Sequence, residues 1–129
     1  MSESVRRRIL VVESYLDNLE SLCMVLDGRG HELEGVATGT RAIAMAASWH
    51  PDIVVLDLAL PDMDGEEVAA AMKTMASPPF IVAFSGHHRR EERARSAGCD
   101  TFVLKPKVDQ LITVLEARIE RHVSAGGAC

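Results

Sequence analysis

Cysteine is scarce in this sequence, and it forms no pattern typical of a disulfide or a metal site. The three cysteines, Cys23, Cys99 and Cys129, are odd in number and include no Cys-x-x-Cys pair. We therefore expect neither a disulfide framework nor a structural zinc site. Unpaired thiols are typical of a reducing compartment, so we expect a cytoplasmic protein.

Long apolar stretches are also missing. The run at residues 9–12, which follows a basic segment, is too short for the hydrophobic part of a secretory signal. No stretch approaches the roughly 20 apolar residues that a membrane-spanning helix needs. We therefore expect neither a secretory signal nor a contact with the membrane.

Positive charge is not in excess either. The 129-residue chain has 14 Lys and Arg against 19 Asp and Glu, which gives a net charge of −5. This balance gives no electrostatic reason to expect direct binding of nucleic acid. The basic cluster Arg6-Arg7-Arg8 flanks a predicted strand, and we interpret it as a solvated edge.

Apolar runs and helical patterns alternate along the chain. Short apolar runs predict strands at residues 9–12, 31–38, 53–56, 80–84 and 101–104. Helical spacing of apolar residues, or runs of alanine, predicts helices at 19–26, 41–48, 68–75, 88–97 and 108–119. This alternation predicts an α/β fold with a parallel sheet of five strands and helices on both faces. We expect one domain over residues 1–123 and a disordered tail over residues 124–129.

Polar residues follow four of these strands. Glu13 and Ser14 come after the first, Asp57 after the third, Ser85 after the fourth and Lys105 after the fifth. The carboxyl ends of parallel strands share one edge, where open α/β sheets bind their ligands. An aspartate there can form an aspartyl phosphate, while Lys105 supplies positive charge and Ser85 a hydroxyl donor. Neighbouring acids favour a hard divalent cation such as Mg²⁺.

These residues resemble the receiver domain of two-component response regulators. The stretch Asp-Leu-Ala-Leu-Pro-Asp-Met-Asp-Gly at residues 57–65 is similar to the phospho-acceptor motif of that family. Ser85 lies at the family's switch Ser/Thr position, Phe102 at its aromatic switch position, and Lys105-Pro106 at its Lys-Pro. The resemblance covers almost the whole chain. Two further matches, where the family often has Asn and Gly, are Asn18 and Gly98.

The resemblance implies a flavodoxin-like, doubly wound sheet with strand order 2-1-3-4-5 and five helices. It implies that Asp57 takes a phosphoryl group from a phosphohistidine on a partner histidine kinase or phosphotransfer protein. Ser85 and Phe102 would then move together and alter the face of the fourth helix, last strand and fifth helix, where a downstream protein binds. Glu13, Asp57 and the backbone carbonyl of Ala59 would hold Mg²⁺. Such a domain is not an enzyme, and we expect it to act as a stand-alone receiver.

The sequence departs from the family at Ser14. Receivers usually end their first strand in two acids, of which the second binds the metal, whereas this chain has Glu13-Ser14. A neutral hydroxyl binds Mg²⁺ more weakly than a carboxylate does. Three hypotheses stay open: weak Mg²⁺ binding, with Ser14 itself as a candidate ligand; recruitment of Glu13 or Asp17; or an interaction module that works without phosphorylation. A phosphatase of the haloacid-dehalogenase type is disfavoured because that family has an acid where this chain has Ala59.

Two clusters elsewhere are interpreted as surface. His87-His88 fits an exposed loop better than a metal site, because adjacent side chains face different ways and no partner cluster is evident. A basic face on the fourth helix fits a solvated surface, with partner docking as the alternative. Its residues are Arg89, Arg90, Arg93 and Arg95.

Overall fold

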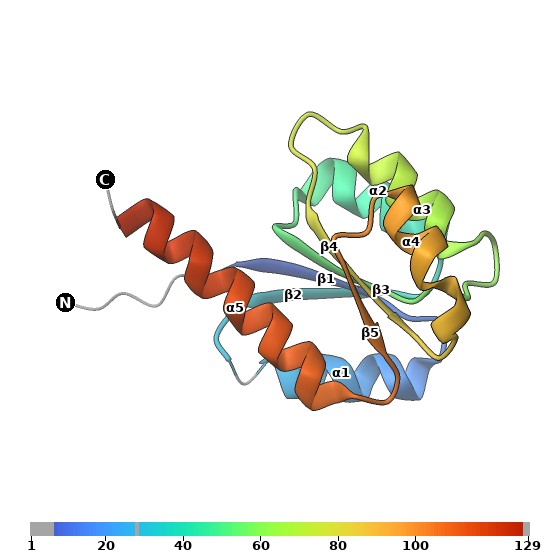
Figure 1. Ribbon diagram of the computed structural model, residues 1–129, viewed down its shortest axis with the longest axis horizontal. Coiled ribbons are helices and arrows are strands. Elements are labelled where there is room, and N and C mark those ends of the chain that lie inside the picture. The colour runs from blue at the N-terminus through green and yellow to red at the C-terminus, as the bar shows by residue number, and fades with distance from the viewer. Residues whose placement is uncertain (1–6, 28, 128–129) are drawn as a thin grey trace.

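A computed structural model describes residues 7–27 and 29–127, with side chains described as far as residue 120. Its strands are β1 Arg8–Val12, β2 Glu32–Val36, β3 Ile53–Leu56, β4 Phe80–Ser85 and β5 Thr101–Leu104. They form one parallel five-stranded sheet in the order β2-β1-β3-β4-β5 (Figure 1). The predicted fold class and strand order are confirmed.

Five helices connect and flank the strands. They are α1 Leu16–Asp27, α2 Gly39–Trp49, α3 Gly65–Lys73, α4 Glu91–Ala97 and α5 Val108–Gly127. Helices α1 and α5 cover one face of the sheet, and α2, α3 and α4 cover the other (Figure 1). The helix predicted at 88–97 begins as a single 3-10 turn, η1 His88–Arg90, before α4.

The end of α5 overlaps the predicted tail. The helix runs to Gly127, so it includes residues 124–127 of the stretch expected to be disordered. Ala128 and Cys129 lie outside the described residues, as do Arg6 and Gly28. The domain boundary at residue 123 stays a prediction.

The central strands divide the core into two layers. Along β1, Leu10 and Val12 pack with α2, α3 and α4, while Ile9 and Val11 pack with α1 and α5. This division follows because successive side chains of a strand point to opposite faces. Every residue of β3 is buried, which is why its sequence is apolar without alternation.

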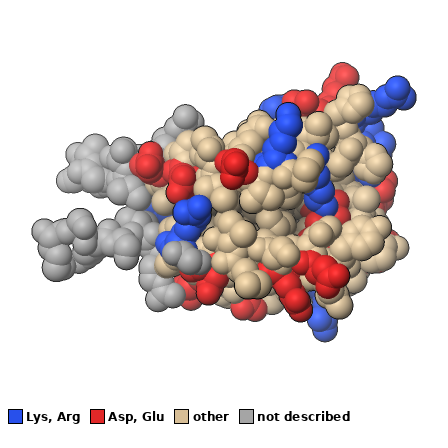
Figure 2. All heavy atoms as spheres, turned by 90° about the horizontal axis from the view of Figure 1, so that it is seen from below, with Lys and Arg blue, Asp and Glu red and all other residues tan. Residues whose placement is uncertain are grey.

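The surface has mixed charge. Figure 2 shows acidic and basic side chains interspersed over the face formed by α1 and α5. In the basic cluster near the N-terminus, Arg8 pairs with Glu32 at 3.4 Å and donates to the Trp49 carbonyl at 2.6 Å. Its side chain stays 43% exposed, as a solvated edge requires. None of the described helices has the length and apolar character needed to cross a membrane.

Candidate functional site

Asp57 lies at the carboxyl end of the sheet, directly after β3. It is only 5% exposed, and its N–H donates to the Val12 carbonyl at 2.9 Å. Its Oδ1 accepts the N–H of Ala59 at 3.1 Å. Glu13, directly after β1, is 1% exposed. Two buried carboxylates therefore face the same edge, as the sequence predicted.

A single cation contacts both carboxylates. The Nζ of Lys105, after β5, lies 2.6 Å from Glu13 Oε1 and 3.6 Å from Asp57 Oδ2. The backbone N–H of Lys105 donates to the Ser85 carbonyl at 2.8 Å, and its peptide bond to Pro106 is cis. The shorter contact of the ammonium is thus with Glu13, and the predicted phospho-acceptor is its second partner.

The pKa of Asp57 is raised above its ordinary value. Burial is the largest cause; the Ala59 N–H and the Lys105 ammonium counteract it, and the Glu13 carboxyl adds to it. Two carboxylates share one ammonium here, so the cluster lacks one positive charge. A cation that bound beside Asp57 would lower its pKa and favour the ionised form.

The predicted metal ligands already have partners within the protein. Glu13 Oε2 accepts the Tyr15 N–H at 3.1 Å, and the Ala59 carbonyl accepts the Ser14 hydroxyl at 3.4 Å. Asp17 is exposed in the first turn of α1. Within the described ranges, no group of three or more His, Cys, Asp or Glu is placed to hold a metal. Two carboxylates and a carbonyl still suit a hard divalent cation in type, with one acid fewer than receivers usually offer.

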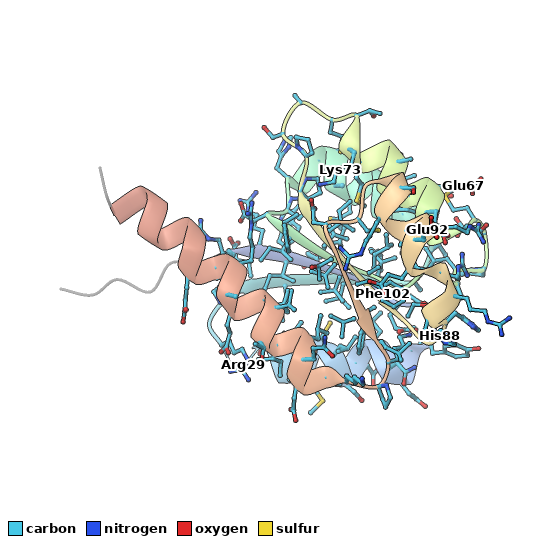
Figure 3. All side chains as sticks on the ribbon, viewed as in Figure 1. Arg29, Glu67, Lys73, His88, Glu92 and Phe102 are labelled. Atoms are coloured by element: carbon cyan, nitrogen blue, oxygen red, sulfur yellow. The ribbon has the colours of Figure 1, made fainter. Side chains whose placement is uncertain are left out.

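The two predicted switch residues lie on adjacent strands. Ser85 closes β4 and is fully buried, and its Oγ accepts the His87 N–H at 3.1 Å. Phe102 of β5 is half-buried and packs against the core layer of α2, α3 and α4 (Figure 3). His87 and His88 are exposed, as predicted, and Figure 3 shows His88 at the start of the short helical segment.

The loop between β3 and α3 fits closely against the site. A Cβ at Gly65 would lie 2.7 Å from the Asp57 carbonyl oxygen, too close for any side chain. Further along the loop, Asp62 accepts the N–H groups of Gly39 and Thr40 at 2.8 and 2.9 Å and the Thr40 hydroxyl at 2.7 Å. These bonds, at the N-terminus of α2, lower the pKa of Asp62 to about 2. Two helices therefore fix the loop that follows β3 and Asp57.

Sequence reasoning missed an ion pair beside the site. Arg90 donates to both carboxylate oxygens of Glu66, at 3.0 and 2.5 Å, and its side chain is only 18% exposed. The prediction of a solvated basic face is therefore wrong for Arg90. It describes Arg95 better, which pairs with Glu91 on its own helix and is 49% exposed. The sequence did hold a signal for this pair. Glu66 lies three residues before Ala69 on the apolar stripe of α3, so its carboxylate could be expected to be buried and to need a cation.

Comparison with known proteins decides the family. A model described as the response regulator receiver domain matches residues 9–116. The chain belongs to the response regulator receiver family. Receivers are signalling modules of two-component systems rather than conventional enzymes.

Relatives of this receiver include regulators and solved receiver structures. The transcriptional regulatory protein KdpE of Mycobacterium tuberculosis is 33% identical over 119 residues, which are 91% of this chain and 53% of KdpE. The chain spans about half the length of the curated relatives it matches.

Solved structures agree with the fold. A CheY-like receiver from Methanospirillum hungatei has a TM-score of 0.84 and 23% identity, and the match covers 94% of this chain and 99% of that chain. The response regulator TrrA of Thermotoga maritima, solved with Mg(2+)-BeF, has a TM-score of 0.80 and 26% identity, and the match covers 86% of this chain and 97% of TrrA. The receiver has the CheY-like flavodoxin fold.

Proposed function

We propose that this receiver accepts a phosphoryl group on Asp57 from a phosphohistidine of a partner histidine kinase or phosphotransfer protein. The observation that carries the proposal is the buried carboxylate of Asp57 at the carboxyl end of a central strand, with Lys105 Nζ 3.6 Å from Oδ2. A carboxylate in this position can attack phosphorus, and the ammonium can balance charge on the transferred group. Free Cys23 and Cys99 suit a cytoplasmic location for this reaction.

Mg²⁺ belongs to the same proposal. Glu13, Asp57 and the Ala59 carbonyl would hold the ion, which would neutralise charge on the phosphoryl group. The Mg(2+)-BeF complex of TrrA supports this assignment by family likeness. In this chain, the Ala59 carbonyl already accepts a long hydrogen bond from the neutral Ser14 hydroxyl at 3.4 Å, where receivers usually have an acid that binds the metal. We therefore expect weaker Mg²⁺ binding than a carboxylate at position 14 would give.

We expect the phosphodonor to dock beside the cluster of Glu13, Asp57 and Lys105. A hollow between α1 and the turn at residues 105–106 reaches Glu13 and the Lys105 ammonium, both of which contact or neighbour Asp57 in the same cluster, and its lining also includes Asn18, Val25 and Pro106. Val25 of α1, which lines this hollow, is 42% exposed. An exposed apolar side chain at a hollow beside the acid cluster suits a helical partner that presents its histidine near Asp57.

The output would pass through Ser85 and Phe102 to the face of α4, β5 and α5. Support comes from their places on adjacent strands, and from α4, which has seven residues of which only Ala94 is buried. A helix with so little apolar anchorage shifts at low cost. We propose that a downstream protein binds this face, and that the domain itself does not contact nucleic acid.

The test is the intact mass of the protein after incubation with a small-molecule phosphodonor, with and without Mg²⁺. We expect one added phosphoryl group that requires Mg²⁺ and is absent in Asp57→Asn. Equal modification of the wild type and Asp57→Asn would reject Asp57 as the acceptor. Equal modification with and without Mg²⁺ would reject the metal.

A second candidate function has one observation in its favour. Because the Ser14 hydroxyl bonds the Ala59 carbonyl, the chain can act as a receiver-like interaction module that needs neither metal nor phosphorylation. Calorimetric Mg²⁺ titration of the wild type, Ser14→Asp and Ser14→Ala separates the two. Stronger binding by Ser14→Asp alone supports the weak-metal receiver, whereas no binding by the wild type, with unchanged partner binding by Asp57→Asn, favours the interaction module.

A further inference from the structure

The Glu66–Arg90 pair, which joins α3 to η1, differs from the ion pair within the following helix, α4. The side chains of Glu66 and Arg90 are 10% and 18% exposed, and the guanidinium uses two nitrogens to contact both carboxylate oxygens. The Arg95–Glu91 pair within α4 has similar distances but is about half exposed on both sides. Bidentate contact away from water makes the first pair both stronger and more directional.

One end of this pair is fixed to the phospho-acceptor strand. Glu66 is in the first turn of α3, immediately after Gly65. The Gly65 N–H donates to the Leu58 carbonyl at 2.8 Å, and the Gly65 backbone lies directly against Asp57. The carboxylate of Glu66 is therefore held in a fixed place relative to Asp57.

The other end leads to the Ser85 hydroxyl through consecutive hydrogen bonds. Arg90 closes η1, and its backbone N–H donates to the His87 carbonyl at 3.0 Å. The His87 N–H donates in turn to Ser85 Oγ at 3.1 Å. The side-chain fork of Arg90 thus connects the turn that carries these two bonds to α3.

Few other contacts hold this turn. No residue of η1 is buried, and α4 buries only Ala94. Asp64, before α3, adds longer contacts of 3.4 Å with Arg90 and 3.8 Å with Arg93. With so little apolar packing in η1, the charge-assisted fork of Arg90, which is largely shielded from water, is a strong side-chain restraint on the position of residues 86–90.

We propose that Glu66 and Arg90 form a positioning pair that sets where the Ser85 hydroxyl lies relative to Asp57. The pair acts through the backbone of residues 87–90 and touches neither the phosphoryl group nor its donor. Its effect on the position of the loop is a property of the unmodified protein. Its effect on signalling rests on the proposed phosphorylation of Asp57.

The electrostatics of Glu66 agree with a tight pair. Burial by itself raises the pKa of Glu66, but the hydrogen bonds and the positive charge of Arg90 outweigh burial, so the pKa lies below its ordinary value. Removing the guanidinium leaves burial uncompensated, so the Glu66 pKa is expected to rise in Arg90→Gln.

The test measures amide hydrogen exchange of His87 and Arg90 in the unphosphorylated protein by NMR. In Arg90→Gln we expect exchange at these amides to be at least about tenfold faster, because hydrogen bonds to charged groups are worth a factor of ten or more. Arg95→Gln is the matched control, since it removes an arginine–glutamate pair from the adjoining helix α4 that has no connection to Ser85. Exchange in this control should stay within about twofold of the wild type, as expected for an exposed i,i+4 pair.

Two further variants separate positioning from a general loss of stability. Arg90→Lys keeps the charge but not the fork, and should restore part of the protection. The double variant Glu66→Gln with Arg90→Gln no longer has an unpaired buried charge, but it still lacks the contact between α3 and η1. Amide exchange of His87 and Arg90 should therefore stay fast in this variant. Wild-type protection in Arg90→Gln, full recovery in the double variant, or equal acceleration in Arg95→Gln would each overturn the proposal.

A second readout covers the signalling consequence. If Asp57 is phosphorylated, Arg90→Gln should change the lifetime of the phosphoryl group at least about threefold, since a displaced hydroxyl donor alters stabilisation of the reacting oxygens. Arg95→Gln should leave the lifetime unchanged. Failure of the wild type to become phosphorylated would reject the proposed function alone, because amide exchange tests the positioning pair without phosphorylation. An unchanged lifetime together with unchanged exchange would reject the pair.

Discussion

Two buried glutamates lie near the carboxyl edge of the sheet, and they differ in whether the positive charge around them matches the negative charge. Glu13 shares the Lys105 ammonium with Asp57, so two carboxylates have one cation, and the pKa of Asp57 is raised. Glu66 has the guanidinium of Arg90 in bidentate contact, and its pKa is lowered. The first cluster lacks a positive charge. In the second, Arg90 also lies 3.4 Å from Asp64, but Arg93 lies 3.8 Å from that carboxylate, so two acids have two cations and this cluster is complete.

This difference separates a reactive site from a structural connection. A cluster short of positive charge gains from a further cation or from charge redistribution when a group is transferred to Asp57. A complete pair gains nothing from an added ion and loses much when one partner is removed. Substitutions that remove a charge should therefore have opposite effects in the two places.

The largest expected effect is on the complete pair. Arg90→Gln should lower the free energy of unfolding at pH 7 by about 3 kcal/mol, because it leaves a buried carboxylate without its partner. Urea denaturation of this variant and of Arg95→Gln measures the cost, which should be below about 0.5 kcal/mol for the exposed pair.

The pH dependence of that cost follows from the lowered pKa of Glu66. A folded-state pKa below the unfolded one contributes stability above the unfolded value, and this is lost as the pH falls through the folded value. The difference between the wild type and Arg90→Gln should therefore shrink as the pH is lowered below about 4, near the ordinary pKa of glutamate. A difference that grew with acidification would contradict the assigned balance.

A smaller cost is expected at the incomplete cluster. Lys105→Gln should lower the free energy of unfolding by about 2 kcal/mol at pH 7, less than the loss of a fully paired partner, because Asp57, whose pKa is already raised, can take up a proton once the ammonium is gone. Denaturation at pH 7 and pH 5 tests this, since proton uptake should make the cost smaller at pH 5. A cost that did not depend on pH would show that Asp57 stays ionised in the variant.

Removing an acid from the incomplete cluster should have the opposite sign. Asp57→Asn should stabilise the protein at pH 7 by about 1 kcal/mol, the scale of single substitutions. Because the folded pKa of Asp57 is raised, its ionisation costs stability as the pH rises through that pKa, and the gain in Asp57→Asn should vanish below the unfolded pKa. Glu66→Gln is the matched substitution in the complete pair, and it should destabilise. Chemical denaturation of both variants decides the comparison, and effects of the same sign would refute it.

The sequence predicted the incomplete cluster better than the complete pair, for a physical reason. Glu13, Asp57 and Lys105 each close an apolar run, and parallel strands bring such residues to one edge whatever the details of packing. The contact between Glu66 and Arg90 joins two helices instead, and it depends on where η1 and α4 lie against α3. Helical periodicity could mark Glu66 as buried, but it could not select Arg90 among its neighbouring arginines.

Other features were beyond pattern reasoning for similar reasons. The preference of Lys105 for Glu13 over Asp57 depends on side-chain geometry. The hydrogen bond from Ser14 to Ala59 joins two loops that are far apart in the sequence. Sequence therefore predicted which side chains gather at this edge of the sheet and where the chain departs from the family, while the structure was needed to find which partners these groups already have.

The last prediction concerns the pKa of a third carboxylate, Asp62, which is exposed and should have the least effect on stability. Among the described residues no cation pairs with Asp62, but the Thr40 hydroxyl and the N–H groups that begin α2 lower its pKa to about 2. A depressed pKa contributes stability at neutral pH that is lost as the pH falls through the folded value, so this contribution should persist to a lower pH than that of an ordinary aspartate. NMR titration of the carboxyl carbon should give a pKa of about 2 in the wild type and a higher value in Thr40→Val, which removes the largest cause. An ordinary pKa of Asp62 in the wild type, or an unchanged pKa in Thr40→Val, would mean that neutral hydrogen-bond donors do not stabilise this ionised carboxylate in the way that Arg90 stabilises Glu66.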